Sequence, residues 1–200
     1  MSFRIRFVNK VEEVHMKYLI ILFSFSFSIA HASFDSEFVD SFESGYKPSK
    51  CGPNITNFIK RLKGADENVS NSKVLTISNK GFSLFLLINA EYGRRTVLNA
   101  NGELQEPGQQ NWYHHVILEN EGMIYDFDFG NTPEILSVKD YFEKMFLNES
   151  ENNTHPAHKV GREIKLKDYE IKVFSANDLL LNPKVSPEKI MRLGEYLKAY

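Results

Sequence analysis

The sequence predicts one α+β domain, and three observations support this fold class. An amphipathic helical pattern comes first, and several short β-branched or aromatic runs follow it. Further helical patterns lie outside these runs, which indicates antiparallel strands with helices packed against them. The length of 200 residues and the 42% of hydrophobic residues are typical of a single globular domain.

The charge of the chain is close to balanced, with a formal net charge of −2 at pH 7. No run of lysine or arginine is long enough to bind an anionic membrane surface. The chain also lacks the basic excess that attracts nucleic acid. We therefore expect no nucleic acid partner.

The N-terminal segment has the pattern of a secretory signal peptide. Lys17 supplies a short positive region, residues 18–29 are apolar, and Ala30 and Ala32 fit a small-x-small cleavage site. The apolar run is shorter than the ~20 residues that cross a bilayer, so a retained transmembrane helix is the weaker alternative.

Residues 1–32 are therefore expected to be a signal peptide and the mature protein to be periplasmic or secreted, without stable membrane insertion. Residues 1–15 precede the signal pattern and are either an over-long start or an extended positive region.

Residues 33–50 mix serine, glycine and proline with scattered aromatic residues, and we interpret them as an N-terminal arm before a domain over residues 51–200. Four apolar side chains of this arm are available to dock on the domain: Phe34, Phe38, Val39 and Phe42. The first helix of the domain is predicted over residues 53–64. Apolar residues recur there at helical spacing, Pro53 suits the first turn and Gly64 suits the C-cap.

The remaining elements follow from the same kind of pattern. Strands are predicted where short β-branched or aromatic runs occur, at residues 72–78, 82–89 and 169–176. Polar segments with glycine or proline are predicted to be loops, at residues 99–111 and 149–159. Helical patterns cover residues 137–148 and 187–200.

Cys51 is the only cysteine, so it has no disulfide partner within the chain, and it directly precedes the predicted helix. The dipole and the free backbone N–H groups at a helix N-terminus favour a thiolate and can stabilise an oxyanion. Cys51 is therefore a candidate nucleophile. The alternative is a small buried residue without a chemical role.

Residues 111–129 are predicted to form a hairpin that brings a histidine to a carboxylate. With a turn at residues 119–122, His115 lies opposite Asp126 on one face. Directly opposed Cβ atoms are about 5 Å apart, so the imidazole can donate to the carboxylate. A shift by one residue would turn His115 to the other face. The pair is a candidate base with its orienting acid or, alternatively, a structural pair.

A metal site is not expected. Neighbouring residues of a regular strand point to opposite faces, so His114 and His115 cannot both bind one ion. His155 and His158 have a suggestive spacing, but they lie in a polar loop that contains Pro156.

Four stretches carry motifs that occur together in one family. They are Cys51-Gly-Pro-Asn54-Ile55 (C-x-x-N-I/V), Leu75-Thr-Ile-Ser-Asn79 (F-I-S-N), Trp112-Tyr-His-His115-Val116 (W-D-Y-H-V) and Ile124-Tyr-Asp126-Phe-Asp128 (I-Y-D-L-D). Weaker matches follow at Thr154-His155-Pro156 and at residues 172–179. In this order, the stretches resemble the protein N-terminal glutamine amidohydrolase family.

The resemblance implies a papain- and transglutaminase-like α+β fold, in which an N-terminal helix carrying the cysteine packs on an antiparallel sheet carrying histidine and aspartate. It implies Cys51 as the nucleophile, His115 rather than His114 as the general acid/base, and Asp126 as the orienting residue. Asn54 and Trp112, which lie in the same motifs, are candidates for substrate binding.

The chain departs from the family beside the cysteine and at its shorter C-terminal tail. Gly52 and Pro53 stand where the family usually has two glutamates. Acidic groups beside the thiol would anchor the α-amine of a substrate, so their loss weakens the expectation that the glutamine is N-terminal. Asp128 is the best substitute and the third substrate-binding candidate, because strand alternation places it on the face of Asp126.

The expected function is therefore that of a secreted or periplasmic thiol amidohydrolase that deamidates glutamine, N-terminal or internal, and releases ammonia. A protein or peptide bearing glutamine is the expected partner, and neither a cofactor nor a metal is required. The alternatives are a papain-like cysteine peptidase, a transglutaminase, or a non-catalytic peptide-binding module of the same fold.

Overall fold

The computed structural model describes residues 33–47, 50–79, 86, 88–89, 114–130, 134–146 and 169–200. The expected signal peptide, both polar loops and most of the strand predicted over residues 82–89 lie outside the described residues. The helices and strands below refer to the described part of the chain.

The first labelled helix, α2 (Cys51–Gly64), confirms the predicted helix and begins two residues earlier than Pro53. It buries one apolar stripe: Ile55, Phe58, Ile59 and Leu62. The spacing of three and four residues between these side chains places them on one face of the helix, which packs on the sheet.

A six-stranded sheet forms the centre of the molecule, with the strand order β4-β3-β2-β1-β5-β6. Every neighbouring pair is antiparallel, as the sequence predicts. The strands are β1 (Lys73–Ser78), β2 (His114–Asn120), β3 (Met123–Asp126), β4 (Glu134–Ser137), β5 (Glu170–Ser175) and β6 (Lys189–Arg192). A mixed α+β architecture is therefore established.

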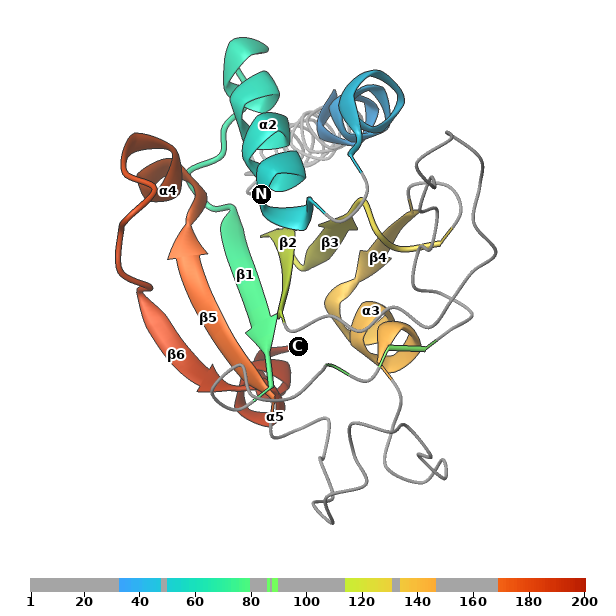
Figure 1. The fold of residues 1–200 in the computed structure, drawn as a ribbon, viewed down its shortest axis with the longest axis vertical. Coiled ribbons are helices and arrows are strands. Elements are labelled where there is room, and N and C mark those ends of the chain that lie inside the picture. The colour runs from blue at the N-terminus through green and yellow to red at the C-terminus, as the bar shows by residue number, and fades with distance from the viewer. Residues whose placement is uncertain are drawn as a thin grey trace, which may run out of the picture.

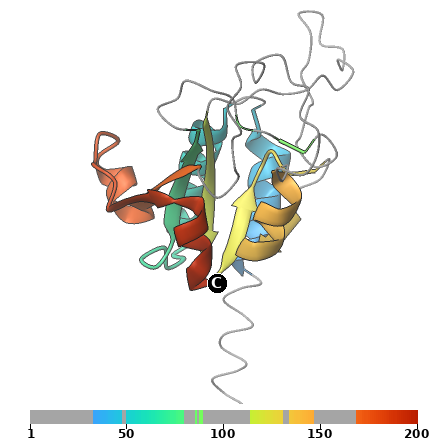
Figure 2. The ribbon, with the colours of Figure 1, turned by 90° about the horizontal axis from the view of Figure 1, so that it is seen from below.

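Helices cover both faces of the sheet (Figures 1 and 2). On one face, α3 (Val138–Met145) and α5 (Leu193–Tyr196) pack against Leu75, Ile77 and Ile117. On the other face, α2 and α4 (Ala176–Leu181) pack near Val74 and Leu118. Alternation along each strand sends successive side chains to these two clusters. The helix α3 lies within the range predicted for it, and the side chain of Ser137 caps its N-terminus.

Residues 33–45 form a helix. The interpretation of this segment as an N-terminal arm did not include a helix. Phe34 and Phe38 are buried against Phe58 and Tyr125, whereas Val39 is 38% exposed. This helix, drawn in blue in Figure 1, lies beside α2. The segment is therefore an integral part of the core on the α2 side of the sheet.

The hairpin turn between β2 and β3 consists of Glu121 and Gly122. Both residues have positive φ, 51° and 82°, which is the pattern of a two-residue type I′ turn. Gly122 adopts this conformation without the steric cost that a Cβ atom imposes. The predicted four-residue turn at residues 119–122 is therefore shifted by one position.

This turn corrects the predicted register of the hairpin. The observed ladder pairs Asn120 with Met123 and Leu118 with Tyr125, so His115 does not lie directly opposite Asp126 as predicted. The pairing differs from the predicted one by two residues, and a shift by two keeps every side chain on its face. His115 and Asp126 therefore remain on one face, in a diagonal relationship.

The C-terminal segment is also corrected. A helix was predicted over residues 187–200, but its first part is the strand β6, which pairs with β5. The helical part is limited to α5 and the short 3-10 helix η4 (Leu197–Ala199). Pairing with β5 satisfies backbone groups of residues 189–192, so the tertiary context overrides the helical periodicity. In the described part of the chain, no helix combines the length and the apolarity that crossing a membrane requires.

Candidate active site

Cys51 is the first residue of α2, and its side chain is partly exposed. The first hydrogen bond of the helix is donated by the backbone N–H of Asn54 to the carbonyl of Lys50, at 2.8 Å. The N–H groups of Cys51 and Gly52 precede this bond and have no partner within the helix. Lys50 provides no side-chain cap for them. They can therefore donate to an oxyanion that forms beside the thiol.

His115 lies on β2 with its side chain 1% exposed, whereas the neighbouring His114 is exposed. This alternation supports the expectation that the two histidines point to opposite faces. The imidazole Nε2 lies 2.8 Å from Oδ2 of Asp126. His115 also forms a hydrogen bond with the side chain of Cys51. Since Nε2 is occupied by Asp126, Nδ1 is the nitrogen available to the thiol.

Asp126 ends β3 and is the most heavily hydrogen-bonded group of the site. Its Oδ2 accepts from His115 and from the hydroxyl of Tyr141 at 2.8 Å, and its Oδ1 accepts from the backbone N–H of Asp128 at 2.9 Å. The carboxylate is 1% exposed, so these donors replace the water that burial removes. The arrangement fixes the orientation of Asp126 and, through it, that of His115.

The surroundings of His115 favour its protonated form. Burial by itself lowers the pKa of the imidazole, but the negative charge of Asp126 and the hydrogen bond to it act in the opposite direction. The hydrogen bond to Cys51 acts in the same direction as Asp126. As a result, the pKa of His115 is raised well above its ordinary value. An imidazolium beside the thiol stabilises a thiolate and is ready to donate a proton.

Asp128, the third substrate-binding candidate, has a side-chain oxygen within 4.8 Å of ring and carboxylate atoms of His115 and Asp126. It is 4% exposed, and its Oδ1 accepts a hydrogen bond of 2.5 Å from the hydroxyl of Tyr46. Its backbone N–H supports Asp126. The structure therefore places Asp128 beside His115 and Asp126, with one of its carboxylate oxygens accepting from Tyr46.

Asn54 lies one helical turn after Cys51 and holds the chain that leads into α2. Its side-chain amide donates to the carbonyl of Lys47 at 2.8 Å, and its Oδ1 accepts from the N–H of Lys47 at 3.1 Å. This pairing anchors the segment before Cys51, so Asn54 has a structural role besides the substrate binding expected of it. Trp112, the remaining substrate-binding candidate, lies outside the described residues.

The side chains of His115, Asp126 and Asp128 each offer a potential ligand atom, and these atoms lie within 4.8 Å of one another. A metal ion there would compete with existing hydrogen bonds, because both oxygens of Asp126 and one oxygen of Asp128 already accept. The donors to these oxygens fit a buried carboxylate network better than an open metal site. The other histidines considered for metal binding, His155 and His158, lie outside the described residues.

Two tyrosines contribute hydrogen bonds to the carboxylates of the candidate site, and the sequence motifs include neither of them. Tyr141 lies in the helical pattern predicted over residues 137–148, and Tyr46 belongs to the segment interpreted as an arm. Burial and then the charge of Asp126 raise the pKa of Tyr141 well above its ordinary value, so its hydroxyl remains a donor. No sequence signal links either tyrosine to its carboxylate, because both contacts depend on tertiary packing.

The chain matches no known protein-family model and no curated protein sequence.

Proposed function

We propose that this protein is a thiol amidohydrolase that converts glutamine side chains of proteins or peptides to glutamate and releases ammonia. The observation that carries the proposal is the buried His115, which interacts with Cys51 on one side and with Asp126 on the other. A nucleophile, an acid/base and an orienting carboxylate in this order form a catalytic triad.

In the first half of the reaction, the Cys51 thiolate attacks the carbon of the glutamine carboxamide. The oxyanion that forms is stabilised by the N–H groups of Cys51 and Gly52 at the start of α2. The His115 imidazolium then gives its proton to the departing nitrogen, the C–N bond breaks, and ammonia leaves behind a thioester.

In the second half, neutral His115 accepts a proton from a water molecule, which attacks the thioester carbon. The C–S bond breaks, Cys51 returns to the thiolate, and glutamate is released. Asp126 keeps the imidazole in the orientation and tautomer that both halves require. Atoms and charge balance without a cofactor, since water is the only other reactant.

The choice of glutamine rests on the ordered motifs around Cys51, Asn79, His115 and Asp126, which resemble the N-terminal glutamine amidohydrolase family. The papain- and transglutaminase-like form of the α+β fold belongs to the same proposal. So does export, which rests on the signal pattern of residues 1–32 and places the activity in a periplasm or outside the cell.

The test is a panel of glutamine peptides incubated with the purified protein, with ammonia and peptide mass measured together. Deamidation releases ammonia, and the peptide keeps its length while an amide becomes an acid. A shortened peptide would instead identify a peptidase, and consumption of an added amine would identify a transglutaminase. An unchanged panel that nevertheless binds the protein would identify a non-catalytic module.

The matched control is Cys51→Ala. This variant removes the thiol from a partly exposed position and leaves the contacts of His115 with Asp126 in place. It should keep the circular dichroism spectrum and the thermal transition of the parent and release no ammonia. Ammonia release by Cys51→Ala at the parent rate would contradict the proposal.

A further inference from the structure

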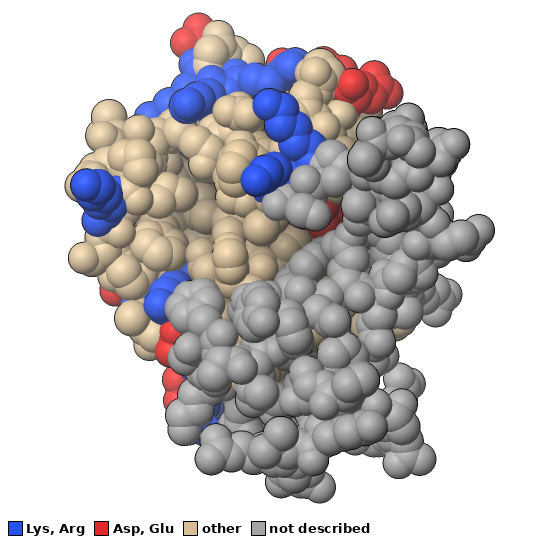
Figure 3. Space-filling model, in the orientation of Figure 1, with Lys and Arg blue, Asp and Glu red and all other residues tan. Residues whose placement is uncertain are grey.

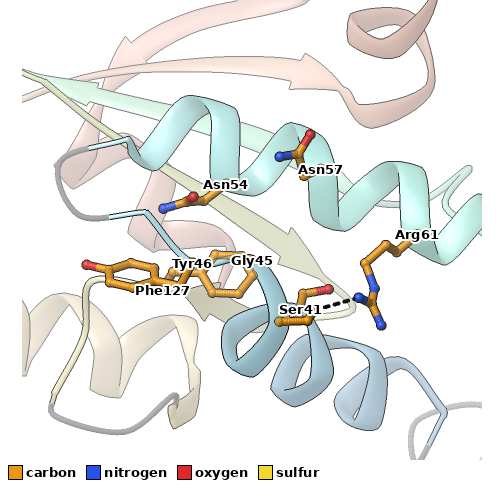
Figure 4. Close-up of a pocket in the computed structure, with 8 residues that line it drawn as sticks. Ser41, Gly45, Tyr46, Asn54, Asn57, Arg61 and Phe127 are labelled. Atoms are coloured by element: carbon orange, nitrogen blue, oxygen red, sulfur yellow. Dashed lines mark hydrogen bonds between the residues drawn. The ribbon is translucent and has the colours of Figure 1, made fainter.

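A pocket of about 200 Å³ lies between α2 and the helix over residues 33–45 (Figure 4). Arg61 and Asn57 approach it from α2, Ser41 from the facing helix, and the rings of Tyr46 and Phe127 form an apolar part of its wall. Its volume is several times the ~30 Å³ that one water molecule occupies in the liquid. It is smaller than the ~300 Å³ of the smallest pockets for drug-sized ligands. It therefore fits a ligand the size of an amino acid or of a single side chain.

The pocket contains hydrogen-bond donors that the described residues do not use. Arg61 donates from Nε to Glu37 at 3.2 Å and from Nη1 to Ser44 at 2.8 Å. A guanidinium carries five N–H groups, so Nη2 keeps donors free for a ligand. The side-chain amide of Asn57 is exposed and makes no hydrogen bond with the described residues.

Ser41 supplies a third polar group at this wall. The residue is 8% exposed, and its hydroxyl is buried without a hydrogen-bond partner among the described residues. A buried hydroxyl without a partner costs free energy, which an acceptor brought by a ligand would recover. Few groups in folded proteins are left in this condition, so the hydroxyl at the pocket wall indicates a polar occupant.

The charge of the pocket indicates the charge of the ligand that it can bind. Arg61 is the only charged residue among those that line it. Glu37 pairs with Arg61 from outside the pocket and neutralises it in part, with 23% of its side chain exposed. Free donors, one cation and an aromatic wall are complementary to a carboxylate carried on a short apolar body.

We infer that this pocket is a binding site for a small aliphatic carboxylate, separate from the triad. The same chemistry is offered by a free dicarboxylate and by an acidic side chain of a peptide. The site does not depend on the proposed amidohydrolase activity, because none of the three triad residues lines it.

The test is isothermal titration of the full chain with two probes. One is glutarate, and the other is a short peptide with blocked ends and a central glutamate, paired with the same peptide containing glutamine. Binding of glutarate alone identifies a free carboxylate as the ligand, and binding of the glutamate peptide but not the glutamine peptide identifies an acidic side chain. If neither carboxylate binds at millimolar concentration, the inference is overturned.

Three substitutions should change the affinity of the pocket for the carboxylate, two of them lowering it and one raising it. Arg61→Gln should weaken binding by about tenfold, because it removes the charged donor. Glu37→Gln should strengthen binding by about threefold, because it removes the competing carboxylate. Ser41→Ala should weaken binding by about threefold without lowering the melting temperature, since the hydroxyl has no partner to lose.

The matched control is Lys63→Gln, which removes a positive charge from the last turn of the same helix but does not line the pocket. It should leave the dissociation constant unchanged. Equal effects of Lys63→Gln and Arg61→Gln would show a nonspecific charge effect and overturn the site. If Arg61→Gln does not fold, the opposite shifts expected for Glu37→Gln and Ser41→Ala decide the question.

Discussion

Nε2 of His115 lies 2.8 Å from Oδ2 of Asp126, although neither residue is the other's partner in the observed ladder between β2 and β3. The two side chains meet along the diagonal of the hairpin, where Cα atoms are about 7–8 Å apart and long side chains still reach one another. Tyr141 binds the same oxygen from α3. The carboxylate is thus positioned by both the sheet and a helix.

Asp126→Asn should lower turnover by about three to four orders of magnitude while the protein remains folded. An amide at this position favours the wrong tautomer of His115, because it can present a donor where the carboxylate accepts. Ammonia release under substrate saturation measures the effect. Asp66→Asn is the control, since this exposed residue, two positions after α2, has a positive φ of 59° that asparagine tolerates. Turnover near the parent value in Asp126→Asn would exclude the orienting role.

Tyr141→Phe should lower the free energy of unfolding by about 1–3 kcal/mol and reduce turnover less than Asp126→Asn does. The change removes one of three donors to a buried carboxylate and leaves the others in place. Chemical denaturation and steady-state kinetics measure the two effects. Tyr196→Phe is the control within the same core cluster, because its hydroxyl contacts Tyr200 instead. Equal turnover in the two variants would show that Tyr141 has only a structural role.

The stability of the protein should fall as the pH rises above about 6.5, the ordinary pKa of histidine. The pKa of His115 is raised in the folded state, so the folded protein binds this proton more tightly than the unfolded chain does. The contribution of His115 to the free energy of unfolding is therefore fully present below the pKa that the histidine has in the unfolded chain. This contribution is lost as the pH rises through the pKa of His115 in the folded protein, and the free energy of unfolding falls by at most ~1.4 kcal/mol per pH unit for one proton. Denaturation curves across this range should show the decline in the parent and a reduced decline in His115→Gln. An unchanged slope in the variant would contradict the assignment.

The proposed amidohydrolase should accept glutamine peptides with a blocked N-terminus nearly as well as peptides with a free α-amine. The first turn of α2 contains no acidic residue, the flanking Lys47 and Lys50 are exposed, and basic side chains gather around α2 (Figure 3). Asp128, the nearest substitute anchor, already accepts from Tyr46. A cationic amine therefore finds little compensation for its desolvation. We expect kcat/KM for free and acetylated peptides to differ by less than about a hundredfold, or ~2.7 kcal/mol. A larger preference for the free amine would reveal an anchor outside the described residues.

Gly122→Ala should reduce the free energy of unfolding by about 1–2 kcal/mol, because a Cβ atom is strained at the positive φ of the turn. The control is Gly64→Ala at the end of α2, where a Cβ atom would meet nothing within 4 Å. That change should be neutral or stabilising by up to ~1 kcal/mol, because alanine favours helix more than glycine does. Thermal or urea denaturation of both variants measures the difference. Equal stabilities would mean that the turn does not hold the hairpin.

Local sequence patterns are sufficient to predict some of the helices and strands. The periodic apolar residues of α2 and the β-branched run of β1 are sufficient to place both elements to within a few residues. The helix over residues 33–45 also had a usable signal, because Phe34, Phe38 and Phe42 are spaced by four residues. Serine and glycine in the segment favoured the interpretation as an arm instead.

Contacts between segments that are distant in sequence determine the elements that local patterns misplace. In β6, the edge of β5 provides hydrogen bonds that override a helical pattern. The face of His115 was predictable, because strand alternation survives the two-residue difference in register. The exact neighbours of the carboxylates were not predictable, since Tyr46 and Tyr141 reach them from helices and loops distant in sequence.

The three residues of the proposed triad, together with Tyr141, span three layers of the fold: the helix α2, the sheet and the helix α3. Cys51 belongs to the helix on one face, His115 to the sheet, and the oxygen of Asp126 is shared with α3 on the other face. Detachment of α2 would separate the thiol from His115, and detachment of α3 would remove a donor from Asp126, even if the sheet stayed intact. The activity that we propose would therefore require all three layers to be packed, and a partly unfolded chain would lack it.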